Sequence, residues 1–210
     1  MGAATWQERL QSTLAADKMK PLMEAYYRAA GDGPIIPESV DYVQMEATEE
    51  NPKFYYYAYM VFLPGRSTGI PVSVEDTAQG TRVEWRTFIE CKDDLLAKFH
   101  EAPATGPSTF RALIRRGHHF DDDVPNQDRM RCLELTSPDA ATTFKIWAPL
   151  DSPVYQRYFA NGERTRWDVS SRMTLTLEWQ KEESGVAWVR LRDVVAESWH
   201  PDLLPAGAAK

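Results

Sequence analysis

The spacing of apolar side chains predicts two helices at the start of the chain. Thr5 and Glu8 have the spacing of a capping box, which opens a short first helix. A second helix is expected from about Asp17, because apolar residues recur there at intervals of three and four positions. Those residues are Met19, Leu22, Met23, Tyr26 and Tyr27. Pro21 falls in the first turn, where a missing N–H is tolerated, and Gly31 ends the helix.

The period of the pattern changes after the second helix, and most later apolar segments alternate as β-strands do. Strands are expected at 42–45, 54–63, 81–89, 110–120, 130–135, 143–147, 173–179 and 186–195. One face of the segment 81–89 would carry Val83, Trp85, Thr87 and Ile89. Gln79 and Gly80, directly before it, are a hairpin signal. Helices are expected at 91–101 and at 152–160, where Ser152 and Pro153 form a helix start.

This order of elements predicts an α+β protein with helices packed on a curved antiparallel β-sheet. Polar and apolar residues alternate in most strands, which is typical of antiparallel sheets with one covered face. Residues 1–200 are interpreted as a single α+β domain and residues 201–210 as a flexible tail. Two packed halves, about 1–105 and 106–200, remain the alternative, because each half has one strand that runs into a helix.

Composition and charge limit the classes of protein to which the chain can belong. The 210 residues are 43% hydrophobic and 11% aromatic, which excludes a disordered chain. Lys and Arg number 24 against 31 Asp and Glu, a net charge of −7, so no nucleic acid is expected as a partner. A protein partner and a small ligand stay open. The longest apolar run, 54–63, is too short for a membrane-spanning helix. We expect a soluble chain, either cytoplasmic or the soluble domain of a membrane-anchored bacterial protein.

The segment 115–123 holds the most conspicuous candidates for chemistry. His118, His119 and Asp121 are weak candidates for general acid–base catalysis, because a histidine beside a carboxylate has a suitable pKa. His119, Asp121 and Asp123 are weak candidates for metal ligands. A closed metal site needs three or four converging ligands, and no second cluster supports these. We favour a strand end that enters an acidic turn, so no catalytic or metal-binding residue and no cofactor is assigned.

A locally basic stretch surrounds Trp167. Its arginines are Arg157, Arg164, Arg166 and Arg172. Guanidinium groups in such a cluster could attract an anionic partner or a phosphate surface, although ion pairing on the surface is the favoured interpretation in an acidic chain. The two cysteines, Cys91 and Cys132, lie far apart in sequence and are interpreted as buried thiols. The chain contains no Gly-x-Gly-x-x-Gly, Walker, Gly-x-Ser-x-Gly or His-Glu-x-x-His motif.

Several stretches taken together carry a resemblance. They are 5–10, 19–27, 71–75, 83–85, 92–96, 118–125 and 193–199. On these stretches the chain resembles an uncharacterised bacterial family of the kind abundant in planctomycete- and verrucomicrobial-type genomes. The resemblance covers most of the chain and implies no activity and no catalytic residues. The helix-then-sheet order is also similar to cystatin-like and NTF2-like folds, which by itself implies no function.

These observations predict a non-catalytic interaction or ligand-sensing domain rather than an enzyme. The first alternative is a small-molecule enzyme with an NTF2-like pocket that uses His118, His119 and Asp121. The second alternative is a metal-binding domain.

Overall fold

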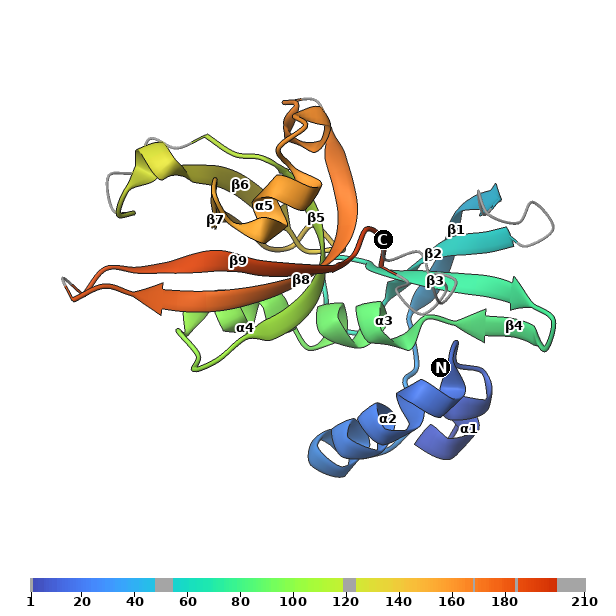
Figure 1. Ribbon diagram of the computed structural model, residues 1–210. Helices are drawn as coiled ribbons and strands as arrows, with labels where there is room; N and C mark the ends of the chain where they lie inside the picture. The colour runs from blue at the N-terminus through green and yellow to red at the C-terminus, as the bar shows by residue number, and fades with distance from the viewer. Residues whose placement is uncertain (1, 48–54, 119–123, 168, 184, 200–210) are drawn as a thin grey trace. The chain divides into compact units, whose positions relative to one another are not determined.

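The computed structural model describes residues 2–47, 55–118, 124–167, 169–183 and 185–199 (Figure 1). The chain divides into two compact units, Met1–Lys92 and Asp93–Lys210. Each unit contains helices and its own β-sheet, so the fold is α+β as the sequence predicts. The alternative boundary expected from the sequence lies near residue 105, whereas the contacts place the division between Lys92 and Asp93. The expected tail, 201–210, lies outside the described residues.

The first unit opens with α1 (Trp6–Gln11) and α2 (Ala16–Ala30), both predicted by their spacing. The capping box is present, since the Thr5 hydroxyl accepts the Glu8 N–H at 3.3 Å and the Glu8 carboxylate accepts the Thr5 N–H at 3.2 Å. α2 ends at Gly31, whose φ of +86° suits glycine. The buried stripe of α2 is Met19, Met23 and Tyr27.

A four-stranded antiparallel sheet completes the first unit. Its strands, in sheet order, are β1 (Ser39–Ala47), β2 (Tyr55–Phe62), β3 (Ile70–Thr77) and β4 (Gly80–Val83). The hairpin predicted at Gly80 joins β3 to β4. The sheet buries Val61, Ile70 and Val72 against Phe88 and Ile89 of α3 (Trp85–Lys92). β3 was not predicted, because Pro71 and the acidic residues near its end have low strand propensity.

The prediction of one strand over 81–89 is wrong. β4 ends at Val83, and α3 begins two residues later. The Glu84 carboxylate accepts the N–H of Arg86 at 3.0 Å and the N–H of Thr87 at 2.8 Å, which satisfies donors at the start of the helix. The alternation of polar and apolar residues therefore continues across the boundary between β4 and α3. The Glu84 carboxylate, which caps the helix, is the sequence feature that could have marked this boundary.

The second unit contains α4 (Leu95–Glu101) and five strands that form a closed barrel. The strands are β5 (Ser108–Arg116), β6 (Met130–Thr136), β7 (Thr143–Pro149), β8 (Ser170–Lys181) and β9 (Ala187–Ala196). Their order around the barrel is β5-β6-β7-β9-β8, and β8 pairs back with β5. All pairs are antiparallel except β7 with β9. The short helix α5 (Pro153–Tyr158) lies between β7 and β8 in the chain (Figure 1).

Full closure of the sheet leaves the five strands without a free edge. A closed barrel with one parallel pair is a different arrangement from a single helix-covered curved sheet, and nothing confirms the cystatin-like or NTF2-like class. Alternation along a strand reports which face is covered, but it does not report which strands pair. Closure depends on the pairing of β5 with β8, about 60 residues apart in sequence, for example Phe110 with Leu175.

The interior of the barrel is filled by apolar side chains. Those buried completely include Ala112, Leu133, Leu135, Ile146, Ala148, Met173, Leu175, Leu177 and Leu191. α5 adds Val154 and Tyr155 to the same core, and Phe159 follows directly after the helix. The Ser152 hydroxyl caps the helix by accepting the Tyr155 N–H at 3.3 Å. The barrel therefore has a packed core rather than a central channel. Within the described residues, no helix is both long enough and apolar enough to span a membrane.

Candidate anion-binding site at the barrel mouth

Two arginines continue the inward-facing positions of the barrel beyond its apolar core. In β5 the buried residues Phe110, Ala112 and Ile114 recur every second position, and Arg116 is the next position on that face. In β6 the buried residues Leu133 and Leu135 are preceded on the same face by Arg131. Arg116 and Arg131 are both half-buried. The sequence of each strand therefore changes from apolar to cationic at one end of the barrel.

The register of the two strands brings these arginines together. Arg116 lies opposite Leu133 across the β5–β6 pair, which makes Arg131 its diagonal neighbour. Gly117 follows directly, and its N–H donates to the carbonyl oxygen of Cys132 at 3.1 Å. A Cβ on Gly117 would lie 2.8 Å from the Cys132 sulfur, so the close approach of β5 to β6 here requires glycine.

A pocket of about 560 Å³ opens beside the arginine pair. Its described lining is Arg116, Arg131, Tyr155, Ala160, Gly162, Arg166 and Trp167. The three arginines come from the end of β5, the start of β6 and the loop between α5 and β8. The pocket is open to solvent on the side of Arg166 and Trp167, both of which are exposed. None of these residues is a carboxylate, so the described wall of the pocket carries only positive formal charge.

Trp167 holds one of the three guanidinium groups. The Arg116 guanidinium carbon lies 4.2 Å from the centre of the Trp167 ring, a cation–π distance. The His118 imidazole stacks on the same indole, with ring centres 4.1 Å apart and an angle of 20° between the planes. Stacking uses the flat face of a guanidinium and leaves its N–H edge available for hydrogen bonds. The indole is half exposed, so the cluster reaches the surface.

Arg116 and Arg131 have no carboxylate partner in the part of the chain that the structure describes. The Arg131 Nε–H is fully buried and has no hydrogen-bond acceptor there. Other arginines of this unit do form ion pairs: Arg115 with Glu134, Arg164 with Glu197, and Arg192 with Glu178. The neighbouring acidic side chains thus neutralise outward-facing arginines, while the inward-facing pair keeps its charge.

The structure places only part of the chemistry expected from the sequence. His118 is exposed, and its carbonyl oxygen accepts the Cys132 thiol at 3.4 Å. His119, Asp121 and Asp123 lie outside the described residues. No group of three or more metal-ligating side chains occurs among the residues that are described. Cys91 and Cys132 are free, buried thiols.

Of the basic stretch around Trp167, one arginine lines the pocket. That residue is Arg166, whereas Arg164 pairs with Glu197. Arg157 lies over the Tyr158 ring and Arg172 over the Trp199 ring, at 5.1 and 5.2 Å from the ring centres. Sequence reasoning missed Arg116 and Arg131. The signal that could have found them is the period of two that runs from the apolar residues of each strand into the arginine.

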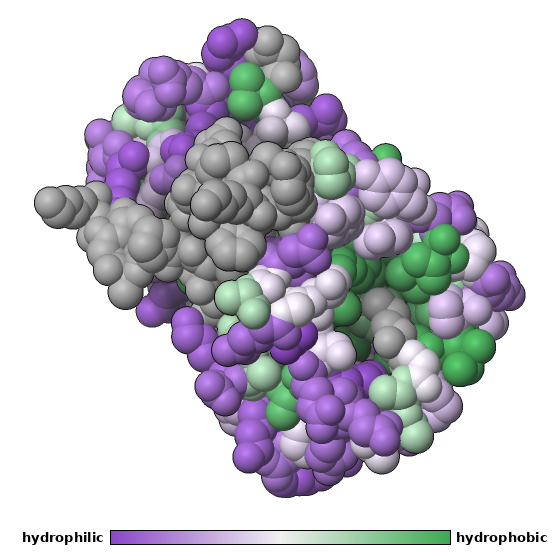
Figure 2. Space-filling view, turned by 90° about the vertical axis from the view of Figure 1, so that its right-hand side faces the viewer, coloured by the Kyte–Doolittle hydropathy of each residue, from purple (hydrophilic) through white to green (hydrophobic). Residues whose placement is uncertain are grey.

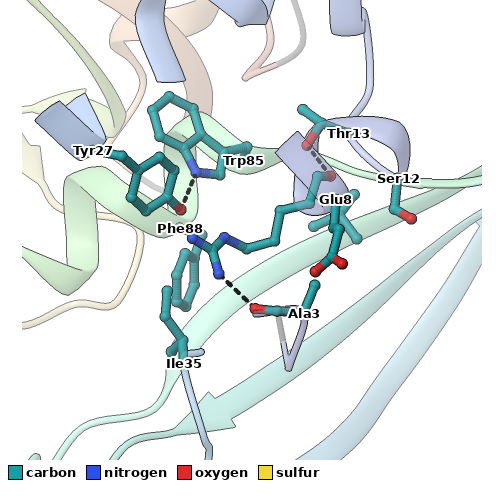
Figure 3. A pocket seen from close by; sticks show the side chains of 10 residues that line it. Ala3, Glu8, Ser12, Thr13, Tyr27, Ile35, Trp85 and Phe88 are labelled. Carbon is teal, nitrogen blue, oxygen red and sulfur yellow. Dashed lines mark hydrogen bonds between the residues drawn. The ribbon is translucent and has the colours of Figure 1, made fainter. Parts of the chain in front are cut away.

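The first unit contains a smaller cavity around a buried arginine (Figure 3). Arg9 donates to the carbonyl oxygens of Ala3 at 2.7 Å and Gly33 at 2.8 Å, and it pairs with Asp32. Its guanidinium also lies 4.5 Å from the centre of the Tyr27 ring. The cavity of about 80 Å³ is far smaller than a typical small-molecule site and has room only for water molecules. These hydrogen bonds and the ion pair of Arg9 therefore fix the N-terminal segment in place.

The sheet of the first unit carries exposed apolar side chains, and Figure 2 shows such side chains gathered on one part of the surface. Along β1 they are Val40, Tyr42, Val43 and Met45. A hollow of about 400 Å³ beside them is lined by Gly2, Pro37, Val40, Tyr59, Val61, Val72, Val74 and Val83. This lining has no charged group, in contrast with the pocket at the barrel mouth.

A buried carboxyl pair also lies in the first unit. Burial raises the pKa of Glu75 to about 7, and the nearby Glu84 carboxylate adds to the effect. Both side chains are more than nine-tenths buried. Glu84 is held by the start of α3, as described above, so Glu75 is the member of the pair that takes up a proton near neutral pH.

Comparison of the chain with known protein families, with curated proteins and with solved structures finds no match.

Proposed function

We propose that the chain is a non-catalytic binding protein whose barrel mouth holds the negatively charged group of a ligand. One observation carries this proposal: Arg116 and Arg131 occupy inward-facing positions at one end of an apolar barrel, and neither has a carboxylate partner in the described part of the chain. The outward-facing Arg115, one position from Arg116, does have such a partner in Glu134.

An anion would offset one unfavourable term in this pocket. Arg116 and Arg131 carry guanidinium groups on neighbouring strands, and their like charges repel each other. A carboxylate or phosphate supplies negative charge and paired oxygen acceptors to both arginines. Arginine binds such groups through two parallel N–H bonds, which adds geometric specificity.

The lining favours binding over proton transfer. A guanidinium stays protonated throughout the physiological pH range, so Arg116, Arg131 and Arg166 can orient an anion but do not act as general acids or bases. The two alternatives are an enzyme that uses His118, His119 and Asp121 in an NTF2-like pocket, and a metal-binding domain. Of their residues only His118 is described, and its imidazole stacks on Trp167 instead of lining the pocket.

Isothermal titration calorimetry with a panel of simple anions tests the proposal, using the full chain in a buffer free of phosphate and carboxylate. We expect saturable binding of at least one anion, weakened at least tenfold in Arg116→Gln and Arg131→Gln. Arg129→Gln is the matched control, because Arg129 is exposed, lies two residues from Arg131 and is not part of the pocket lining. Absence of binding, or equal losses in all three variants, would contradict the proposal.

A further inference from the structure

We infer that the barrel-mouth pocket takes a small phosphomonoester, with the phosphate on the arginines and a neutral, largely apolar body against the rest of the lining. The inference rests on the proposed function and adds the class of ligand to it. It is drawn from the number of guanidinium groups, from the chemistry of the remaining lining and from the charge of the surroundings.

The number of arginines favours a phosphate over a carboxylate. A carboxylate carries one charge and two oxygens, and a single arginine can bind both oxygens. The pocket presents three guanidinium groups, from Arg116, Arg131 and Arg166, on three separate elements. A phosphomonoester carries a charge of about −1.5 to −2 near pH 7 and three terminal oxygens, so each oxygen can accept from a different arginine.

The rest of the pocket suits a body without charge. The pocket volume of about 560 Å³ exceeds what a phosphate group alone would fill. Tyr155, Ala160, Gly162 and the Trp167 indole make up the remaining lining, and none of these side chains is charged near neutral pH. A neutral ring or short apolar chain attached to the phosphate would contact Ala160, Gly162 and the exposed part of the Trp167 indole that His118 and Arg116 leave uncovered.

The surroundings disfavour a nucleic-acid strand. Residues 93–210 contain 15 Lys and Arg against 18 Asp and Glu, whereas a polyanion needs positive charge that continues along its backbone. Outside the pocket, Arg115, Arg164 and Arg192 each pair with a carboxylate. Trp167 already contacts His118 and Arg116, which leaves less of its ring for stacking successive bases. In the described part of this unit the positive charge is thus interrupted by carboxylates and does not continue along the surface as a polyanion needs.

Four probes separate the parts of this inference when titrated calorimetrically into the full chain at pH 7.5. Phenyl phosphate has the dianion and the ring, benzoate has a ring with a single charge, inorganic phosphate has no ring, and a hexathymidylate strand is a polyanion. We expect phenyl phosphate to bind at least tenfold more tightly than each of the other three. Its affinity should fall below about pH 6, where the second proton of the phosphate returns.

Variants assign the binding to the pocket. Arg131→Gln and Arg166→Gln should each weaken phenyl phosphate at least tenfold, and Arg129→Gln should change it less than twofold. Circular dichroism and thermal unfolding of each variant establish that it is folded before binding is compared. Equal weakening by Arg129→Gln would mean that the general charge of the barrel, and not the pocket, attracts the ligand, and would overturn the inference.

The outcomes also distinguish this inference from the proposed function. If benzoate binds as tightly as phenyl phosphate, the site takes anions but not specifically phosphate, and only the inference fails. If inorganic phosphate binds as tightly, the ester body contributes nothing, and the ester part of the inference fails. If the hexathymidylate binds most tightly, the small-ligand part fails. If none of the four probes binds, both the inference and the proposed function fail.

Discussion

Replacing Arg131 with methionine should make the unliganded protein more stable while it removes anion binding. Methionine keeps an unbranched, flexible stem of similar reach, so contacts with the core end of the barrel are largely retained. The substitution removes the buried Nε–H that lacks an acceptor. It also removes the charge that faces Arg116 across the β5–β6 pair. A binding residue that opposes folding is typical of a site that is stabilised by its ligand.

The magnitude follows from these two terms. A buried donor without an acceptor costs about 1–3 kcal/mol. Side chains on diagonal positions of a strand pair start about 7–8 Å apart, and two unit charges at that separation repel by about 2 kcal/mol at an effective dielectric constant of about 20, or about 0.5 kcal/mol in water. Half-exposed groups are screened, so we expect a net gain of about 1–3 kcal/mol in the free energy of unfolding of the second unit.

Urea unfolding of the wild type, Arg131→Met and Arg129→Met measures this gain, with phosphate and other polyvalent anions left out of the buffer. Arg129→Met is the control, because Arg129 is exposed and its loss should change the free energy of unfolding by less than about 0.5 kcal/mol. If Arg131→Met lowers the free energy of unfolding by 1 kcal/mol or more, Arg131 makes net favourable contacts in the free protein. Such a result would contradict a role for Arg131 as an unpaired charge that is stabilised by a ligand.

Three further substitutions test other parts of the structure. Glu75→Gln should remove a pH dependence of the free energy of unfolding. The folded state raises the pKa of Glu75 from 4.5 to about 7, so its carboxyl stabilises the fold at low pH. That stabilisation is lost as the pH rises through 7. Urea unfolding at pH 5 and pH 8 should show a decline for the wild type that the variant lacks. Trp199→Ala should lower the free energy of unfolding by about 3–5 kcal/mol, since the indole is 9% exposed and donates to the Ala112 carbonyl oxygen at 3.0 Å. An effect below about 1 kcal/mol in thermal unfolding would show that the packing of Trp199 against β5 does not stabilise the second unit. Gly117→Ala should cost about 1–3 kcal/mol, because the new Cβ meets the Cys132 sulfur at 2.8 Å, whereas Gly33→Ala, with no atom within 4 Å, should be close to neutral in the same assay.

Local features of the fold could be predicted from the sequence. The capping box at Thr5, the stripe of α2 and the start of α5 at Pro153 each depend on a few neighbouring residues, and all three are present. The two main errors have different causes, one local and one non-local. The segment 81–89 alternates as a strand does, yet the capping carboxylate of Glu84 starts a helix within it. Closure of the barrel depends on pairing between β5 and β8, which no local pattern reports.

The candidate site could be predicted only in part, for the same reason. Arg166 and Trp167 belong to a basic stretch that is visible in the sequence, and both line the pocket. Arg116 and Arg131 stand in different strands, and their significance comes from the register that makes them neighbours on the inner face. The segment 115–123 was chosen as a candidate site because it is rich in histidine and aspartate. The one histidine of that cluster that is described, His118, stacks on Trp167.

The most direct test of the central claim is to observe the Nε–H groups of the arginines by two-dimensional ¹H–¹⁵N NMR while phenyl phosphate is added. Those of Arg116 and Arg131 should shift saturably with the same dissociation constant, because a phosphate bound to a guanidinium group changes the electronic environment of the whole group. The exposed Arg129 should not follow that curve. If Arg129 shifts together with Arg116 and Arg131, or if none of the three shifts at millimolar ligand, the barrel mouth is not an anion-binding site.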